Sequence, residues 1–349
     1  MNSRPINLGI VGIGRATQSM HLKELEGRES KFRIAAACDI IQERRNMMAE
    51  RYGCSAYERV EDLIADPKVE MVDIATRSLD HFAHAKLALE AGKYVFLEKP
   101  MCTTYKDALA LAKIAESTGN RLYIRHNRRF EPAFTHIREI IASGILGDVY
   151  QIKLQRAQYI RRGDWQTIIE CGGGMLLNWG PHIIDHALRL LESPVKSMFS
   201  DLKSIATIGN AEDHIKIVFM GENGRMVDME ICFGAALGQD VYMVWGTRGA
   251  LSSDEETIKL RYIDANQELS NKSANPGTPD IGDYCLPEKL EWVEQTIPVE
   301  PQLKVDMTSI WDYLYSSVRE GAPFPITMDE ALSVIKVISD VKAATQYRN

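Results

Sequence analysis

Short apolar runs of strand length alternate with helix-like segments over the first third of the chain. The runs lie at 6–11, 33–38, 71–75, 94–97 and 121–124. Between two of them, in the segment 82–91, Ala83, Leu87 and Ala91 fall on one helical face, and Gly92 suits a left-handed cap. Such alternation is typical of a parallel sheet with helices on both faces. We therefore expect a doubly wound α/β domain over residues 1–125.

The pattern changes after residue 125. A helix is predicted over 132–142, and long strand-like runs follow it at 149–157, 196–208, 214–220, 225–233 and 241–245. The turn formed by residues 221–224 is a hairpin signal between two of these runs. Consecutive strands with tight turns indicate a large, mostly antiparallel sheet. Residues 126–349 are thus expected to form a second domain of the α+β class.

The last part of the chain is predicted to be a loop and two helices. The segment 275–287 is rich in Pro, Gly and Asp and is expected to be exposed. One helix is predicted over 306–320, and the other begins at the capping box formed by Thr327 and Glu330. The final helix is expected to pack back on the first domain.

Composition narrows the function without defining it. The 349 residues carry a formal net charge of -7 and no block of lysine or arginine, which argues against nucleic acid and membrane surfaces as partners. No apolar run approaches the roughly 18 residues that span a bilayer. The first strand begins at Ile6, which leaves no room for a signal peptide ahead of it, so a cytoplasmic enzyme is expected. The six scattered cysteines form no C-x-x-C pair and are expected to be reduced.

A glycine turn follows the first predicted strand. Gly12 allows a tight turn, and Gly14 lets backbone N–H groups approach a pyrophosphate at the start of a helix. Thr17 stands where the usual fingerprint has its third glycine, so a chance turn remains an alternative. Asp39 ends the second strand, 25 residues after Gly14, close to the spacing of the acid that binds an adenosine ribose. This carboxylate favours NAD over NADP.

Arg44 and Arg45 are a mild signal in the opposite direction, although arginines on a helix more often form a solvated face.

Lys99 follows the fourth strand, between Glu98 and Pro100. The carboxyl ends of parallel strands meet at one edge of a sheet, so we expect the lysine beside the ligand that the glycine turn holds. A cationic amine placed there stabilises a hydroxyl that loses its proton. Glu98 is expected to hold the amine in place. The alternative is a solvated lysine at the end of a strand.

The glycine-rich segment 172–185 leads into a helix with Pro181 near its first turn. Asn178 and His182 are four residues apart, which puts them on one face of a helix. Histidine is the natural proton carrier near neutral pH. Two alternatives are a core histidine and a metal pair of His182 and His186 with Asp185.

Together these motifs resemble the glucose–fructose oxidoreductase/inositol dehydrogenase family of pyridine-nucleotide sugar dehydrogenases. The resemblance is carried by the glycine turn, Ala75-Thr76 with His81, Glu98-Lys99-Pro100, 127–130, 172–185 and 246–249. It implies a Rossmann domain and a second domain whose open sheet commonly forms an oligomer interface. A homodimer or homotetramer is therefore expected.

The resemblance also assigns roles to residues. The catalytic residues it implies are Lys99 and His182, with Asn178 beside them. The expected cofactor-binding residues are Gly12, Gly14, Arg15, Ala16, Asp39, Ile40, Thr76, Ser78, His81, Glu98, Lys99, Asn127 and Trp165. The expected substrate-binding residues are Lys99, Arg125, Tyr159, Asn178 and His182. No metal is expected.

Three positions depart from the family pattern. Asn178 stands where the family usually has aspartate, and an amide cannot carry a proton. Arg77 replaces the usual proline after Thr76. Gln166 follows Trp165 where arginine is common. The proton relay and the cofactor clamp are the parts of the site that these changes affect.

The expected function is NAD-dependent oxidation or reduction at a ring secondary alcohol or ketone of a sugar, sugar derivative or cyclic polyol. His182 exchanges the hydroxyl proton and Lys99 stabilises the oxygen. One alternative is an NAD-retaining glycoside 3-oxidase or redox-assisted glycosidase. Another is a non-catalytic regulator that senses NAD(P), although the presence of both Lys99 and His182 speaks against it.

Overall fold

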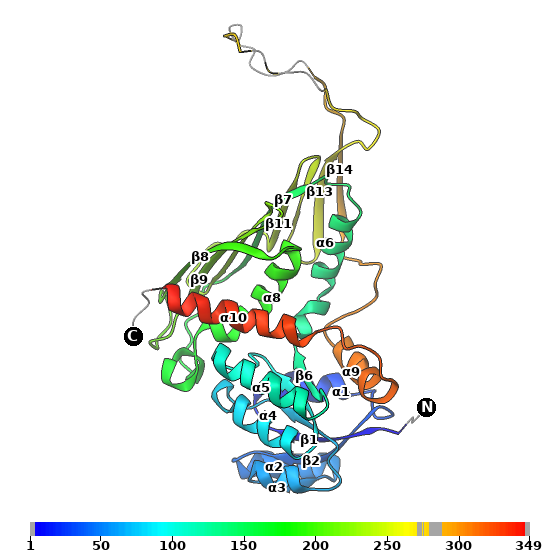
Figure 1. Ribbon diagram of the computed structural model, residues 1–349, viewed down its shortest axis with the longest axis vertical. Helices are drawn as coiled ribbons and strands as arrows, with labels where there is room; N and C mark the ends of the chain where they lie inside the picture. The colour runs from blue at the N-terminus through cyan, green and yellow to red at the C-terminus, as the bar shows by residue number, and fades with distance from the viewer. Residues whose placement is uncertain (1–3, 271–273, 275, 279–287, 346–349) are drawn as a thin grey trace.

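The computed structural model describes residues 4–270, 274, 276–278 and 288–345. It contains two sheets stacked along the long axis of the molecule (Figure 1). The N-terminal sheet lies in the lower half of the figure and the larger second sheet in the upper half, with the C-terminal helix running between them. Both predicted sheets and the α/β fold class are confirmed.

The first sheet has six parallel strands in the order β3-β2-β1-β4-β5-β6. The strands are β1 Ile6–Val11, β2 Phe32–Cys38, β3 Ser55–Tyr57, β4 Met71–Ile74, β5 Tyr94–Glu98 and β6 Leu122–Arg125. The chain order reverses between β1 and β4, so the carboxyl ends of these two strands border the crevice where doubly wound sheets bind ligands.

Helices cover the faces of this sheet. They are α1 Leu22–Leu25, α2 Gln42–Tyr52, α3 Val60–Ala65, α4 His81–Glu90 and α5 Tyr105–Ser117. A π-helical turn, η1 Thr17–His21, precedes α1. As predicted, Gly92 after α4 is left-handed, with φ of +75°. Thr104 accepts a hydrogen bond from the N–H of Asp107 at the start of α5.

The second sheet has eight strands in the order β14-β13-β12-β11-β7-β10-β9-β8. They are β7 Val149–Ala157, β8 Val195–Lys203, β9 His214–Gly221, β10 Met226–Cys232, β11 Tyr242–Gly246, β12 Gly249–Ser253, β13 Thr257–Ile263 and β14 Trp292–Pro298. Neighbouring strands are antiparallel except for β7 and β10, which are parallel. The sheet is therefore open and mostly antiparallel, as the sequence predicts.

Helices α6 Pro132–Ala142, α7 Met175–Asn178 and α8 Gly180–Leu191 belong to the second half of the chain. The α8 helix packs on β9 and β10 and, with α7, carries the glycine-rich motif. Helix α9, Ser309–Glu320, returns to the first sheet, where its Trp311 lies in one core with Ile6 and Phe96. Helix α10, Met328–Ala344, contacts both α5 and α8 (Figure 1).

The predicted strand boundaries were wrong in places. The run 196–208 was expected to be strand throughout, but β8 ends at Lys203. The backbone N–H groups of residues 205, 206 and 207 instead donate to the carboxylate of Asp213, which bends the chain into a loop. Strands β3, β12, β13 and β14 were not predicted. Most of the predicted loop 275–287 lies outside the described residues.

Candidate active site

The glycine turn after β1 has the shape that a pyrophosphate requires. Gly12 has φ of +89°, and a Cβ there would lie 2.7 Å from the carbonyl oxygen of Ala75. A Cβ on Gly14 would meet no atom within 4 Å, so the backbone there faces open space. Arg15 and Ala16 follow and lead into η1. These residues fit a dinucleotide phosphate group at the carboxyl end of β1.

Asp39 lies at the end of β2, beside the turn. Its carboxylate accepts hydrogen bonds from the N–H of Ile13 at 2.7 Å and of Ile41 at 2.9 Å. Arg44 donates to the same carboxylate at 3.3 Å. Ile40, next to it, is 84% exposed and offers an apolar surface at this point. The carboxylate is thus fixed beside the glycine turn, with one arginine against it.

His81 ties two loops of the crevice together. Its Nδ1 lies 2.7 Å from the carbonyl oxygen of Pro100, and its Nε2 lies 3.3 Å from that of Thr76. Ser78 lies in the short helical turn η2, Ser78–Asp80, just before α4. The loops after β4 and β5 are therefore joined behind the position of Lys99.

Lys99 crosses from the first domain to the second. Its Nζ donates to the backbone carbonyl of Asn178 at 3.0 Å. The expectation that Glu98 holds the amine is wrong, because Glu98 accepts the backbone N–H of Lys99 at 3.1 Å instead. In the described part of the chain, no carboxylate oxygen lies within 4.0 Å of Nζ. Burial, together with Arg128, Arg125 and Arg15, lowers the pKa of Lys99, while Glu98 opposes this shift.

Glu98 belongs to a buried ionic network that supports the lysine loop from behind. Its Oε1 lies 3.0 Å from Nε2 of His21 and accepts from Arg125 at 2.8 Å. Nδ1 of His21 lies 2.8 Å from the carboxylate of Asp73. Arg125 also donates to Glu24. The network therefore links β4, β5, β6 and η1 beneath the crevice.

The charges in this network stabilise one another. Burial alone would lower the pKa of His21, but the charge of Asp73 and hydrogen bonds to Asp73 and Glu98 outweigh it and raise the pKa to about 9. Burial opposes ionisation of Glu98, yet Arg125 and His21 hold its pKa well below the ordinary range. Arg125, expected in the sugar pocket, is 1% exposed and lies within this network.

His182 lies near the start of α8 and is 7% exposed. Its Nδ1 is buried and has no hydrogen-bond partner among the described residues. Its ring and that of Trp179 form a T-shaped contact, with 6.3 Å between the ring centroids. Burial and the charges of Lys99 and Arg128 hold the pKa of His182 well below 6.5. The expectation that this histidine titrates near neutrality is therefore wrong for the free protein.

Asn178 ends α7, and its backbone and its side chain bind different partners. The carbonyl oxygen accepts from Lys99, while the side-chain amide donates to Oε1 of Gln166 at 3.2 Å. Arg162 donates to the same oxygen of Gln166. Asn178 and His182 thus sit on consecutive turns that run from α7 into α8, with the lysine between the two domains.

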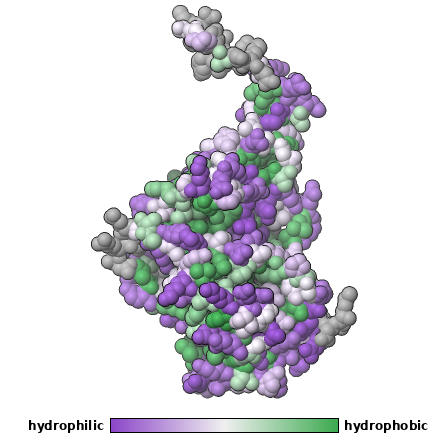
Figure 2. Space-filling view, viewed as in Figure 1, coloured by the Kyte–Doolittle hydropathy of each residue, from purple (hydrophilic) through white to green (hydrophobic). Residues whose placement is uncertain are grey.

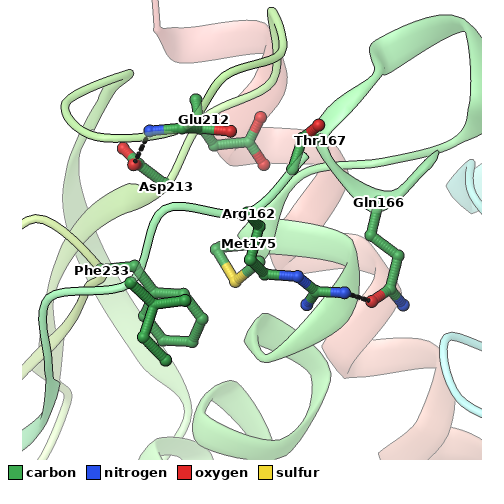
Figure 3. A pocket seen from close by; sticks show the side chains of 9 residues that line it. Arg162, Gln166, Thr167, Met175, Glu212, Asp213 and Phe233 are labelled. Atoms are coloured by element: carbon green, nitrogen blue, oxygen red, sulfur yellow. Dashed lines mark hydrogen bonds between the residues drawn. The ribbon is translucent and has the colours of Figure 1, made fainter. Parts of the chain in front are cut away.

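A small pocket adjoins this arrangement on the side of the second domain (Figure 3). Its lining includes Arg162, Gln166 and Thr167 on one side and Met175, Glu212, Asp213 and Phe233 on the other. Gln166 connects it to Asn178. Tyr159, expected to contact the sugar, is 60% exposed and forms an isolated β-bridge with Gly234.

Arginine side chains pack against aromatic rings on both sides of the crevice. The guanidinium of Arg77 lies 5.6 Å from the ring centre of Trp165, so the residue that replaces the family's proline reaches the second domain. Arg128 lies 4.4 Å from the ring centre of Trp179. Asn127, the residue before it, is 5% exposed at the end of β6. Trp165 is thus in contact with the loop after β4.

The alternative metal pair has other partners. Asp185 accepts from Arg129 at 2.9 Å. Nε2 of His186 donates to the carbonyl of Arg128 at 2.8 Å, and its ring stacks on Phe134 at 3.9 Å. Burial lowers the pKa of His186 to about 3. Across the described ranges, no group of three or more His, Cys, Asp or Glu side chains is arranged to hold a metal ion.

Two family models match the chain. One describes an oxidoreductase family with an NAD-binding Rossmann fold and matches residues 6–126, and the other describes the GFO/IDH/MocA C-terminal domain and matches residues 134–252. The chain belongs to the Gfo/Idh/MocA oxidoreductase family. Its first domain is the NAD-binding domain of that family.

Two relatives by sequence and one solved structure are similar to this chain. The chain is 25% identical to the scyllo-inositol 2-dehydrogenase (NADP(+)) IolW of Bacillus subtilis, covering 80% of this chain and 77% of that protein. It is 28% identical to the D-glucoside 3-dehydrogenase of Escherichia coli over 57% and 58% of the two chains. An NAD-binding protein from Listeria innocua has the same fold, with a TM-score of 0.82 and 26% identity over 98% and 95%.

Three further structural facts bear on this Gfo/Idh/MocA chain. None of its described helices is long and apolar enough to cross a membrane. Figure 2 shows hydrophilic and hydrophobic residues intermingled over the visible face. The cysteines of the described segments, Cys38, Cys54, Cys102, Cys171 and Cys232, are unpaired.

Sequence reasoning missed several residues that shape the site. His21 and Arg128 reach the site through contacts with segments that are distant in sequence. Glu212 caps the first turn of α7 by accepting the N–H of Leu176 at 3.0 Å. It lies so close to Gly174 that a Cβ there would be 2.2 Å from its carboxylate. The glycine itself was the available signal, since it marks a close approach that needs a partner.

Proposed function

We propose that the protein transfers a hydride between NAD and a ring secondary alcohol or ketone of a sugar, sugar derivative or cyclic polyol. The observation that carries the proposal is the hydrogen bond from Lys99 to Asn178, four residues before His182. It brings a cation from the NAD-binding domain to the end of α7, directly before the helix that bears the proton carrier. The two relatives named as dehydrogenases of an inositol and of a glucoside support this substrate class.

A bound NAD would supply the hydride acceptor, carbon 4 of its nicotinamide ring. His182 removes the proton of the substrate hydroxyl, and its low pKa keeps it in the neutral, proton-accepting form. Lys99 stabilises the alkoxide-like oxygen as the carbon gives up its hydrogen and two electrons. A carbonyl forms, and one proton remains on His182. In the reducing direction His182 returns that proton.

The other assigned residues hold these groups in place. Gly12, Gly14, Arg15 and Ala16 would hold the pyrophosphate, and Asp39 with Ile40 the adenosine. The nicotinamide half of the crevice would be formed by Thr76, Ser78, His81, Asn127 and Trp165. Glu98 would support it from the buried network beneath. Asn178 would orient the site through Gln166, and Tyr159 would contact the sugar. Arg125 is assigned to the support of Glu98.

Cofactor choice follows from Asp39. Its carboxylate would accept hydrogen bonds from the ribose and repel a 2′-phosphate, so NAD should bind at least about tenfold more tightly than NADP, or about 1.4 kcal/mol. Fluorescence titration with both cofactors measures this difference. Asp39→Ala should remove most of it. Equal affinity of the unmodified protein for both cofactors contradicts the assignment.

A panel of polyols, sugars and glycosides, monitored by NADH absorbance, tests the reaction itself. The glucoside relative favours a second candidate, oxidation at carbon 3 of a glycoside. Aryl glycosides with catalytic amounts of NAD distinguish the two, because release of the aglycone without net NADH indicates a redox-assisted glycosidase. Binding of NAD without turnover of any panel member would favour the sensor alternative.

A further inference from the structure

The two ring nitrogens of His182 lie in different surroundings. Nδ1 is buried and has no hydrogen-bond partner among the described residues. It is the only buried, unpartnered atom of this ring in the described structure, so Nε2 is the nitrogen that a substrate can reach. A neutral histidine acts as a base through Nε2 only while its proton is on Nδ1, and a buried N–H needs an acceptor. The site therefore needs an acceptor for the Nδ1–H of His182.

The polar side chains on the same helical segment have other partners. The amide of Asn178 donates to Gln166 at 3.2 Å. Both carboxylate oxygens of Asp185 accept from Arg129. The two ring nitrogens of His186 lie 2.8 and 3.3 Å from oxygen atoms of other residues. None of these groups binds the inner nitrogen of the proton carrier.

His126 is a second histidine with free ring nitrogens. It is 1% exposed, and both of its ring nitrogens are buried without a partner in the part of the chain that the structure describes. Buried polar groups in native proteins nearly all bind a protein group or an ordered water. Among the described residues, His126 and His182 are the two histidines with a buried, unpartnered ring nitrogen.

His126 follows β6 and lies beside Lys99. Glu98 and Arg125, the last residues of β5 and β6, are paired in register. Lys99 and His126 come directly after them, and the charge of Lys99 is among those that act on His126. Lys99 in turn donates to the carbonyl of Asn178. His126 is therefore next to the lysine that joins the two domains.

A contact between two helical segments brings His126 towards His182. The short helix η3, Asn127–Phe130, begins directly after His126 and contacts α8. Arg129 of η3 binds Asp185, which lies three residues after His182 in α8. His126 is also among the groups whose charge acts on His182. The two imidazoles thus share one buried junction of β6, η3 and α8.

We infer that His126 is a positioning residue for His182: it accepts the Nδ1–H of His182 through one ordered water and so fixes the tautomer in which Nε2 is the base. Burial lowers the pKa of His126 to about 4, which leaves one ring nitrogen as an acceptor near neutral pH. A buried water needs polar groups on at least two sides, and the two rings supply them.

This inference rests on the proposed hydride transfer and adds a residue to it. When His182 takes the proton of the substrate hydroxyl, that proton stays on its Nε2. Nδ1 keeps its own proton and donates it more strongly to the water, because a charged donor forms a stronger hydrogen bond. His126 therefore orients the base and stabilises the imidazolium without changing its own protonation.

Nitrogen-15 NMR of the NADH complex, labelled in its histidines, measures the tautomer of His182. Its signals are identified by their loss in His182→Gln. The proton of the wild-type ring should be on Nδ1, and His126→Leu should shift the ring towards the form protonated on Nε2. A wild-type ring protonated on Nε2, or the same tautomer in wild type and His126→Leu, overturns the inference.

Steady-state kinetics separate a positioning role from a structural one. His126→Leu should lower kcat at least about tenfold while KM and NAD affinity stay nearly unchanged, because the tautomer of the base matters in the reaction and not in binding. His126→Gln, whose amide oxygen can accept from the same water, should recover most of the loss. His214→Leu, at a half-buried histidine on β9, is the matched control and should alter neither kcat nor the tautomer. Equal losses in His126→Leu and His126→Gln overturn the inference.

Failure of the inference and failure of the proposed function give different results. If no sugar or polyol reduces NAD, the proposed reaction fails, and the tautomer still decides the role of His126 because it is measured without turnover. If a substrate is found and His126→Leu keeps the wild-type kcat, the reaction stands and the role of His126 is overturned.

Discussion

Lys99 and His182 come from different domains and have different work in the proposed reaction. Lys99 supplies charge to the reacting oxygen and is held by the carbonyl of Asn178. His182 moves the proton and is kept neutral by its surroundings. Losing one or the other should therefore change the kinetics in different ways.

Lys99→Ala should lower kcat by about 10²–10³, the usual loss when a preorganised charge is removed. His182→Ala should lower it by about 10²–10⁴ and also remove an inflection of the pH–rate profile of kcat/KM that lies below pH 6.5. Stopped-flow and steady-state NADH absorbance measure both. NAD affinity, titrated in parallel as a control, should stay nearly unchanged. Near wild-type turnover in Lys99→Ala would refute the catalytic assignment.

At the scale of the element, the carboxyl ends of β1, β4, β5 and β6 deliver the first half of the site. The helical segment from α7 to α8 delivers the second. Glu212 holds the start of that segment from a distant loop, and the network around His21 holds the loop after β5. These two sets of contacts fix the positions of the segments that carry Lys99 and His182.

The parts of the site that local rules control could be predicted from the sequence. The turn at Gly12, the lysine at the end of β5 and the histidine helix all follow from strand ends, glycines and spacing. The partner of Glu98 could not be predicted, because His21 and Arg125 reach it across 77 and 27 residues. Strand β13 alternates apolar and polar residues from Ile258 to Tyr262 and could have been predicted. Strands β12 and β14 depend on pairing with their neighbours in the sheet.

The network around His21 should stabilise the first domain in a pH-dependent way. His21→Ala leaves Glu98 and Asp73 buried without their shared cation and should cost about 3–5 kcal/mol. The pKa of His21 is raised from 6.5 to about 9, so its stabilisation is complete below pH 6.5 and is lost as the pH rises through about 9. Urea unfolding at several pH values measures the free energy of unfolding of wild type and variant. The gap between these two free energies should close as the pH rises from 6.5 to above 9.

His136→Gln, at a half-buried histidine on α6, is the control for this measurement and should show no comparable gap. A gap between wild type and His21→Ala that stays constant from pH 6.5 to above 9 would show that the histidine is not held as a cation.

At the scale of the whole molecule, the second sheet has one face covered by α8 and α10 and one open face. The open face carries apolar residues on neighbouring strands, namely Phe199, Val218, Met220, Met226, Met243 and Trp245. Charged residues lie among them, and Lys216 pairs with both Asp228 and Glu230. A mixed face of this kind suits a symmetric contact with a second copy of the chain.

Association should occur through this open face. Light scattering at micromolar concentration should return at least twice the 39.3 kDa of one chain. Phe199→Asp, at a side chain that is 62% exposed, should shift the mass towards a single chain and leave NAD affinity unchanged. A wild-type mass of 39.3 kDa would contradict the proposed assembly.

The most direct test of the proposed reaction follows the hydrogen itself. The best substrate of the panel is prepared with deuterium on the carbon of the reacting alcohol and incubated with the enzyme and NAD. Mass spectrometry of the reduced cofactor should show one deuterium per molecule, and the transfer should have a primary kinetic isotope effect. Lys99→Ala should slow this transfer without abolishing it. Reduced cofactor without deuterium, or label released to solvent, would contradict hydride transfer from the ring carbon to NAD.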